Sequence, residues 1–337
     1  MQNITLIGID LGKHSFHIHC QDKSGKVLLR KSLLVPNLLS FWQAVPRLPL
    51  LTVVMEACAG AHFMARRIAD LGHEAKLISP QFVRPFVKSN KNDFVDAEAI
   101  CEAASRPSMR FVQPRTEAQQ AMRALHRVRE SLVSDKVKTT NQMHAFLLEF
   151  GISMPTGVAV VKRLSTVLAE NELPPYLAQL LMRLHAHYIY LVGQITELEI
   201  ALEQELSRDE VGQRLQTIPG IGPITASVLS SQLGDGKQYS CSRDFAASTG
   251  LVPRQYSTGG KNTLLGISKR GDKNLRRLLV QCARSFIQRI ENQSGRLADW
   301  VRALLARKHS SVVCCALANK LARIAWTITT QQTMFER

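Results

Sequence analysis

The first hundred residues combine short apolar runs with amphipathic stretches, a pattern typical of strands followed by helices. Three runs come first with only short polar turns between them, and the later runs are separated by stretches of helical periodicity. The expected strands are 4–9, 15–20, one starting at 27–29, 50–55 and 74–78, and the expected helices are 37–46, 61–71 and 93–104. This order, β-β-β-α-β-α-β-α, predicts an α/β sheet with helices on both faces.

The order fits a ribonuclease-H-like architecture, which we expect to occupy residues 1–115. In that architecture acidic side chains converge from strand ends and from one late helix. Asp10 ends the first strand, Glu56 ends the short central strand, and Asp93 and Asp96 lie in the last expected helix. The sequence therefore predicts that these four carboxylates lie close together.

Carboxylates in these positions suit divalent cations. The spacing of Asp93 and Asp96 places both side chains on one face of a helix. A carboxylate at the end of a buried strand costs free energy unless its charge is compensated. Two Mg²⁺ ions would compensate the charge and would activate a phosphodiester for in-line displacement. The four acids therefore predict a metal-dependent enzyme that acts on nucleic acid.

Residues 116–208 have the pattern of long helices. One helix is expected over 116–150, where Gly151 and Pro155 end it, and residues 176–206 carry a heptad repeat. The a and d positions of that repeat are Leu177, Leu181, Leu184, Tyr188, Leu191, Ile195, Leu198 and Leu202. Such a seam predicts a central coiled coil or a long helical hairpin. Two interpretations stay open: the seam joins two copies of the chain, or it packs against helix 116–150.

A mostly helical C-terminal domain is expected over residues 209–337. Its longer helices are expected at 272–290, 295–307 and 310–328. Residues 215–226 have the pattern of two helices joined by the turn Pro219–Gly222, which resembles the hairpin of helix-hairpin-helix modules. Gly220 and Gly222 would let the backbone approach a phosphate closely, and the free amides of the following helix would face it. A plain structural turn is the alternative.

Residues 250–261 are rich in glycine and hydroxyl side chains, and we expect a flexible loop there. Ser257, beside Gly259 and Gly260, would be either an ordinary turn serine or an exposed nucleophile. Basic side chains surround this stretch and could clamp phosphates. The candidates for that contact are Arg254, Lys261, Lys269 and Arg270.

The charge of the chain favours a polyanionic partner. The formal net charge is +16, and residues 257–337 hold 15 Lys and Arg against 4 Asp and Glu, a net charge of +11. Because nucleic acid is the usual polyanionic partner of such a surface, we expect the last quarter of the chain to contact it. The alternative is a merely solvated basic face. Hydrophobic residues make up 45% of the chain, enough for a packed core.

The remaining polar residues predict no further site. None of the seven cysteines forms a Cys-x-x-Cys pair, so we expect reduced thiols in a cytosol and no structural zinc. No apolar stretch reaches the roughly 18–20 residues of a membrane span, and the N-terminus begins with a strand pattern rather than a signal peptide. His17 and His19 alternate outward from strand 15–20 and are expected to be solvated.

Taken in order, six segments resemble the DEDD-type insertion-sequence transposases, recombinases guided by a bridge or seeker RNA. Three resemble the N-terminal domain of that family and three its C-terminal domain, over nearly the whole chain. The segments are Gly8–Lys13, Met55–Gly60, Asn92–Glu98, Ile218–Gly222, Phe245–Arg254 and Gly266–Asp272.

The resemblance implies a bacterial transposase that excises and inserts its own mobile element. A Holliday-junction-resolvase-like nuclease domain would bind magnesium through the four acids, which match Asp10, Glu56, Asp93 and Asp96. A serine of the C-terminal domain would attack DNA and form a covalent phosphoserine link. The implied partners are donor and target DNA, an element-encoded guide RNA, and a second subunit in a homodimer that pairs into a tetramer. The implied location is the cytoplasm, at the nucleoid, with no membrane partner.

The position of the nucleophile departs from the pattern of many relatives, which have Ser-Gly at this place. Here Ser257 is followed by Thr258, Gly259 and Gly260, so a strict alignment puts Thr258 at the nucleophile position. The branched β-carbon of threonine crowds the attack. Ser257 is favoured because a glycine-rich loop can shift by one residue. The Ser-Thr-Gly-Gly-Lys motif resembles the subgroup whose elements have subterminal inverted repeats and insert at narrow target sites.

Three other functions fit part of the same residue pattern. A hydrolytic junction resolvase would use the four acids alone and would not need Ser257. A nucleic-acid-binding protein with a degenerate nuclease fold would need neither metal nor intact acids. An actin-like ATPase is suggested only by Gly8–Lys13, because no second acidic-glycine phosphate motif follows.

Overall fold

The computed structural model describes residues 3–34, 50–88 and 92–336. The chain divides into two compact units, Met1–Gln120 and Ala121–Arg337. The boundary falls in the first turn of a long helix, a few residues beyond the predicted boundary at 115. The further division of the second unit at residue 208 stays a prediction.

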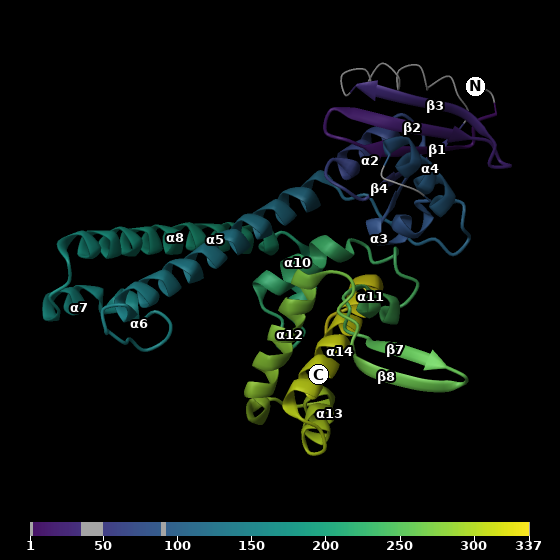
Figure 1. The fold of residues 1–337 in the computed structure, drawn as a ribbon. Coiled ribbons are helices and arrows are strands. Elements are labelled where there is room, and N and C mark those ends of the chain that lie inside the picture. The colour runs from purple at the N-terminus through teal and green to yellow at the C-terminus, as the bar shows by residue number, and fades with distance from the viewer. Residues whose placement is uncertain (1–2, 35–49, 89–91, 337) are drawn as a thin grey trace. The chain divides into compact units, whose positions relative to one another are not determined.

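The first unit is built on one six-stranded sheet (Figure 1). Its strands are β1 Leu6–Leu11, β2 Ser15–Gln21, β3 Val27–Leu34, β4 Thr52–Glu56, β5 Glu74–Ile78 and β6 Phe111–Val112. They lie in the order β3-β2-β1-β4-β5-β6. The central pairs β1–β4 and β4–β5 are parallel, whereas β2, β3 and β6 pair antiparallel with their neighbours. The predicted α/β sheet is therefore confirmed, with β6 as an unexpected sixth strand.

Helices cover both faces of this sheet. They are α2 Ala61–Asp70, α3 Pro80–Val83, the 3₁₀ turn η2 Arg84–Phe86 and α4 Asp93–Ala104. One apolar core joins Ile7 and Ile9 of β1 to Ala65 and Ile68 of α2. A separate core joins Val54 and Ile78 to α3 and α4 on the other face. The predicted helix 37–46 lies outside the described residues.

Gly8 lets α4 pack directly on β1. A Cβ at Gly8 would lie 2.5 Å from the carbonyl oxygen of Ala97 and 2.6 Å from the Sγ of Cys101. Because both contacts are closer than real Cβ atoms allow, any larger residue would push the helix away. The glycine therefore sets the height of α4 above the sheet, on the side of the candidate acids.

The second unit is mostly helical, as predicted. Its helices are α5 Glu117–Leu148, α6 Ala159–Lys162, α7 Leu164–Glu170, α8 Pro175–Ser207, α9 Glu210–Gln216, α10 Pro223–Leu233, α11 Ser242–Ser248, α12 Lys273–Gln288, η3 Ile290–Asn292, α13 Arg296–Leu305 and α14 Ser310–Gln331. A large apolar core unites α9 to α14. A turn joins α9 to α10, at the place of the predicted helix-hairpin-helix element.

The helices α5 and α8 run side by side (Figure 1), and Arg129 of α5 pairs with Glu199 of α8. Met143 and Leu147 of α5 share an apolar core with Leu181 and Tyr188 of α8. Of the eight predicted seam positions, five are buried and three are half-buried within the single chain. The seam therefore packs inside one subunit, the second of the two interpretations, and the coiled coil itself stays a prediction.

Helix α14 is long and apolar enough to cross a membrane by length and composition alone. Half of that stretch is buried, and many of its apolar residues, among them Leu317, Leu321 and Ala325, belong to the core of the second unit. It has the burial of a core helix. The absence of a membrane partner stays a prediction.

The expected loop over 250–261 is wrong. Its larger part is an antiparallel hairpin of β7 Pro253–Thr258 and β8 Lys261–Ile267, turned at Gly259 and Gly260. Both turn glycines have positive φ, the conformation that tight hairpin turns demand. Both strands are exposed along nearly their whole length. Without an apolar face, the segment lacks the alternation by which strands are predicted.

Candidate active site

Strand pairing brings Asp10 and Glu56 to the face of the sheet that α4 covers. Side chains alternate along a strand, so Asp10 faces the same side as Gly8, and Glu56 the same side as Val54. Gly8 touches α4, and Val54 lies in the core beneath it. Asp10 is the fifth residue of β1 and Glu56 is the last residue of β4, so both carboxylates lie where their strands end.

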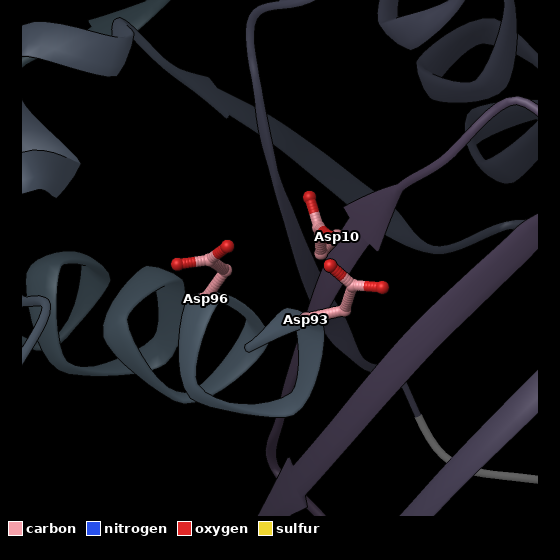
Figure 2. Close-up of side chains that lie close together, drawn as sticks. All are labelled: Asp10, Asp93 and Asp96. Atoms are coloured by element: carbon pink, nitrogen blue, oxygen red, sulfur yellow. The ribbon is translucent and has the colours of Figure 1, made fainter. Parts of the chain in front are cut away.

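The first turn of α4 supplies the other two carboxylates. The side chain of Asn92 caps the helix and accepts a hydrogen bond from the backbone N–H of Phe94 at 3.0 Å. Asp93 and Asp96 follow directly, and acidic groups are favourable at this positive end of a helix. Figure 2 shows both side chains on α4 beside Asp10 of β1. Carboxylate oxygens of the three aspartates lie within 4.8 Å of one another.

The negative charges of this cluster shift the pKa of Glu56. Burial raises the pKa of the Glu56 carboxyl above its ordinary value, and the nearby charges of Asp10 and Asp96 raise it further. The same residue is half-buried at the end of a central strand. Glu56 is therefore a carboxylate whose ionised form is opposed by its surroundings and would be favoured by a cation.

The four carboxylates fit a divalent metal. Oxygen ligands are those that Mg²⁺ prefers, and three of them already lie within one ion's reach of each other. A cation among them would offset both the mutual repulsion and the burial of Glu56. A DEDD-type site of this kind would supply a Lewis acid for phosphodiester chemistry.

His17 is a further residue of this site and was not predicted. It lies directly opposite Asp10 in the β1–β2 pairing, so both side chains leave the same face of the sheet. Its Nδ1 is 3.6 Å from Oδ2 of Asp93, and its ring packs edge-on against Phe94. The prediction that His17 and His19 are solvated is wrong: the side chain of His17 is 13% exposed and His19 is buried.

In the second unit, Ser257 belongs to a polar network on one face of the hairpin. Its Oγ donates a hydrogen bond to Oδ1 of Asn262 at 2.9 Å and accepts one from Nε2 of Gln255 at 2.7 Å. Gln255 also donates to Asn262 at 3.3 Å. The network fixes the hydroxyl on an exposed strand. Amide groups do not take up a proton near neutral pH, so these two partners orient Ser257 without activating it.

Thr258 leaves the opposite face of the hairpin. Ser257 pairs with Asn262 and Thr258 with Lys261, and neighbours along a strand point to opposite sides. The expected flexible loop is a paired hairpin here, in which a one-residue slip would exchange the two faces, so the choice between Ser257 and Thr258 stays a prediction. The two hydroxyls are distinct candidates presented to different surroundings.

A hollow of about 1540 Å³ lies between the base of this hairpin and α14. Its lining includes two of the predicted phosphate-binding residues, Arg254 and Lys269, together with Lys320 and Arg323 of α14. The Nζ of Lys320 lies 4.1 Å from the ring centroid of Trp300. Burial and the neighbouring Arg323 lower the pKa of Lys320. Four cations against one acid, Glu336, make the hollow electrostatically suited to phosphates.

Lys269 and Arg270 are held on a turn that packs against the chain at Gly250. The backbone N–H of Lys269 donates to the carbonyl of Gly250 at 3.0 Å. A Cβ at Gly250 would lie 2.1 Å from the carbonyl oxygen of Arg270, and one at Gly271 would lie 1.8 Å from that of Ser248. Both glycines have positive φ, as does Lys269. The turn thus presents two exposed cations from a tightly packed backbone.

The other residues predicted to contact nucleic acid, Lys261, Gly220 and Gly222, do not line the hollow beside α14. Lys261 opens β8 beside the Gly-Gly turn and is exposed. A Cβ at Gly220 would lie 3.0 Å from the carbonyl oxygen of Cys282, so its packing against α12 already requires a glycine. Nothing lies within 4 Å of a Cβ at Gly222, which caps α10. Phosphate contact at these three positions stays a prediction.

Both the part of the chain that holds the acids and the part that holds the hairpin are similar to known proteins. A family model described as "Transposase", of the DEDD IS110 type, matches residues 7–152, the part that holds the four acids. A second, described as "Transposase IS116/IS110/IS902 family", matches residues 212–298. The "Transposase for insertion sequence element IS1328" of Yersinia enterocolitica is 70% identical over 337 residues, the full length of both chains. The chain belongs to the IS110 family of insertion-sequence transposases.

Other relatives of this transposase cover almost the same length. The "Probable family 20 transposase" of Pseudomonas aeruginosa is 42% identical over 99% of each chain. The "Transposase for insertion sequence element IS1111A" of Coxiella burnetii is 39% identical over 99% of this chain and 92% of its own. The predicted family is thus confirmed. As a transposase, the protein is an enzyme that cleaves and rejoins DNA.

Some residues of this transposase site are visible in the sequence and others are not. The acids follow strand patterns or open a helix, which is why their convergence is predictable. His17 is missed because alternation along a strand does not tell which neighbour covers its polar face. Lys320 and Arg323 are missed because a long apolar helix resembles a core element, and two cations on it resemble ordinary solvated charges.

Proposed function

We propose that this transposase recombines DNA under the guidance of an element-encoded RNA, with a metal-dependent acidic site and a phosphoserine intermediate. The observation that carries the proposal is the acidic cluster. Asp10, Asp93 and Asp96 lie within 4.8 Å of one another beside the charge-sensitive Glu56, in a chain of the IS110 family. A cation would offset the burial of Glu56 and its repulsion by Asp10 and Asp96.

Asp10, Glu56, Asp93 and Asp96 would hold two Mg²⁺ ions. Bound there, magnesium would polarise the scissile phosphate and stabilise the charge that develops on it. The residues themselves fix the position of the site: two carboxylates come from adjacent strands and two from a capped helix end. His17 would orient Asp93 from the neighbouring strand β2.

Ser257 would be the nucleophile. Its Oγ would form a bond to the phosphorus of the scissile phosphodiester while the bond from phosphorus to one deoxyribose oxygen breaks. The serine proton would leave to solvent or a carboxylate, and the departing sugar oxygen would gain a proton. An incoming sugar hydroxyl would later reverse these changes, release Ser257 and join the strands. No energy source is needed, because one phosphodiester is exchanged for another.

Donor and target DNA are the proposed substrates, and an RNA transcribed from the element would choose them by base pairing. The protein would then read shape and backbone through its cations, among them Arg254, Lys269 and Arg270. The acids and Ser257 belong to different compact units. A homodimer that pairs into a tetramer on two DNAs would unite them, in the bacterial cytoplasm at the nucleoid.

The competing function is a hydrolytic nuclease that uses the acids alone. The two are separated by full-length protein incubated with Mg²⁺, element-junction DNA and RNA transcribed from the flanking non-coding region. We expect Ser257→Ala to abolish both strand joining and cleavage. Cleavage that persists in Ser257→Ala, with water as the nucleophile, would establish the nuclease and refute the serine step.

The acids are tested in the same reaction. Asp10→Asn and Asp96→Asn should abolish recombination and leave nucleic-acid binding within about twofold, because the basic surface is unchanged. Glu102→Gln is the matched control: it also removes an acid from α4, but that acid pairs with Lys88 at 2.6 Å. Full recombination by Asp10→Asn would refute the metal site.

A further inference from the structure

The hollow beside α14 has an apolar wall as well as cations. Leu265 of β8, Val312 of α14 and Met334 line it, and all three side chains are exposed. Trp300 and Ile324 belong to the same lining. Large apolar side chains that gather on one exposed surface indicate a binding site, whereas single ones do not. Because phosphates alone would leave this wall in water, the hollow suits a ligand that has an apolar part as well as negative charge.

One face of the β7–β8 hairpin continues this surface, and we call it the Tyr256 face. Side chains alternate along a strand, so Leu265 leaves the same face as Thr263, and Tyr256 shares that face because it pairs with Thr263. Lys261, two residues before Thr263, leaves this face as well and is exposed. Tyr256 is 66% exposed, and Arg254 of the same strand lines the hollow. The Tyr256 face therefore combines an open aromatic ring with cations at both ends of the hairpin.

The opposite face of the hairpin carries Ser257. Its polar network joins Ser257 and Gln255 to Asn262, and Leu264 leaves the same face because it pairs with Gln255. Among the described residues that line the hollow, none of these four is present. The candidate nucleophile and the apolar wall therefore face different segments of any nucleic acid that the hairpin contacts.

We propose that the Tyr256 face and the adjoining hollow bind an unpaired DNA strand, on the side of the hairpin away from the attacked phosphate. The proposal rests on the proposed function, in which the guide RNA pairs with one DNA strand and displaces the other. Phosphates of the displaced strand would contact Arg254 and Lys261, while one base stacks on Tyr256 and the next packs against Leu265 and Val312. Cations along the backbone and aromatic rings under the bases are the means by which proteins hold single strands without reading their sequence.

The apolar wall favours an unpaired DNA strand over a duplex and over RNA. In a duplex the faces of the bases are hidden in the stack, and the protein meets only phosphates, sugars and the base edges in the grooves. An unpaired base offers its apolar face to Tyr256 and to the wall. An RNA strand would place 2′-hydroxyls against Leu265 and Val312, where they would lose hydrogen bonds to water without replacement. Deoxyribose has no such group to desolvate.

Binding is tested on the full-length protein without Mg²⁺, by fluorescence anisotropy with a DNA single strand, the duplex of the same sequence and the matching RNA strand. Tyr256→Thr should weaken binding of the DNA single strand by about tenfold, because a stacked base is lost, and Leu265→Thr should weaken it too. Both variants should change duplex binding by less than about twofold, since duplex affinity comes from phosphates. Threonine suits a strand, so the hairpin is kept. Leu264→Thr is the matched control: Leu264 is 65% exposed on the opposite face of the same strand.

Photo-cross-linking tests where the strand lies. A DNA single strand that contains iodouracil should cross-link to Tyr256, as mapped by mass spectrometry, and Tyr256→Phe should keep the wild-type affinity because the ring, not the hydroxyl, stacks. Equal losses for duplex and single strand, an equal loss for the RNA strand, or a loss in Leu264→Thr as large as in Leu265→Thr would each overturn the proposal. None of these results would affect the serine step or the metal site, because the binding needs neither metal nor guide RNA.

Discussion

Carboxylates that lie close together at the end of a sheet repel one another, and this repulsion contributes to the raised pKa of Glu56. Its first cause is burial and its second is the charge of Asp10 and Asp96. In the absence of a cation, the acidic site therefore destabilises the folded protein, as functional sites often do. The sequence shows where the acids lie, but not that burial and neighbouring charges raise the pKa of Glu56.

Glu56→Gln should separate stability from activity. Without divalent cations, the variant should melt a few degrees above the wild type, because a half-buried charge beside two others is removed. Addition of Mg²⁺ should raise the Tm of the wild type and raise that of Glu56→Gln by less. Differential scanning calorimetry with and without EDTA measures both effects, with Glu102→Gln as control. An equal Mg²⁺ shift in both proteins would exclude Glu56 from the metal site.

We expect His17 to act on the site through Asp93, which lies 3.6 Å from its Nδ1, rather than by contact with substrate. His17→Ala should weaken Mn²⁺ binding by about tenfold, since groups that orient metal ligands have effects of that size. His17→Gln keeps a hydrogen-bond donor and should recover part of the loss. Isothermal titration of Mn²⁺ into the full-length protein measures this directly. Unchanged Mn²⁺ affinity in His17→Ala would mean that the ring only packs against Phe94.

Between elements, a buried histidine joins α5 to α10. Nε2 of His126 lies 3.0 Å from Oγ of Ser227, and both residues are buried. Burial, with a smaller contribution from Arg129, lowers the pKa of His126 from 6.5 to about 4. The imidazole is therefore neutral in the folded protein at neutral pH, and α5 is attached to the C-terminal core through an uncharged hydrogen bond.

That contact makes stability depend on pH. Between pH 6.5 and about 4 the unfolded chain binds a proton at His126 that the folded chain excludes. Stability is therefore full above pH 6.5 and falls as the pH drops through that window, by at most about 3 kcal/mol. Urea denaturation at pH 7.5, 5.5 and 4.5 measures the loss, which should shrink in His126→Asn but not in His14→Asn. An equal acid loss in all three proteins would refute this role.

The elements that the sequence predicts well are those with an apolar face. β1, β4 and α4 stand out by runs and periodicity, and the acids follow from their ends. The hairpin of β7 and β8 is missed because both strands are exposed and lack a continuous apolar face. The heptad repeat of α8 predicts a seam but not its partner, because packing within and between chains requires the same pattern.

For the molecule as a whole, the net charge of +16 predicts a polyanionic partner but not where it binds. The fold gathers part of that charge in the hollow beside α14, where Lys320 and Arg323 of the helix join Arg254 and Lys269. These residues are far apart in sequence, and only the packing of the hairpin base against α14 brings them to one surface. Position, rather than number, makes these cations a candidate binding surface.

Lys320→Gln/Arg323→Gln should weaken binding of element-end DNA and reduce its salt dependence. Removal of one cation that binds a phosphate lowers the slope of log K against log salt by about 1, so we expect a reduction of about 2. Fluorescence anisotropy at several salt concentrations measures the slope. Lys138→Gln/Lys162→Gln removes two exposed charges elsewhere and should change it little. Equal slopes in both double variants would show that the hollow does not bind phosphate.

The proposed mechanism depends most on a covalent bond between Ser257 and DNA. The most direct measurement is to incubate the wild type with Mg²⁺, element-junction DNA and the flanking RNA, denature it, and map any DNA-linked residue by mass spectrometry. The mechanism predicts an adduct on Ser257 that requires Mg²⁺ and is absent in Asp10→Asn. Cleaved DNA without an adduct would contradict it, as would an adduct on Thr258, whose side chain lies on the other face of the hairpin.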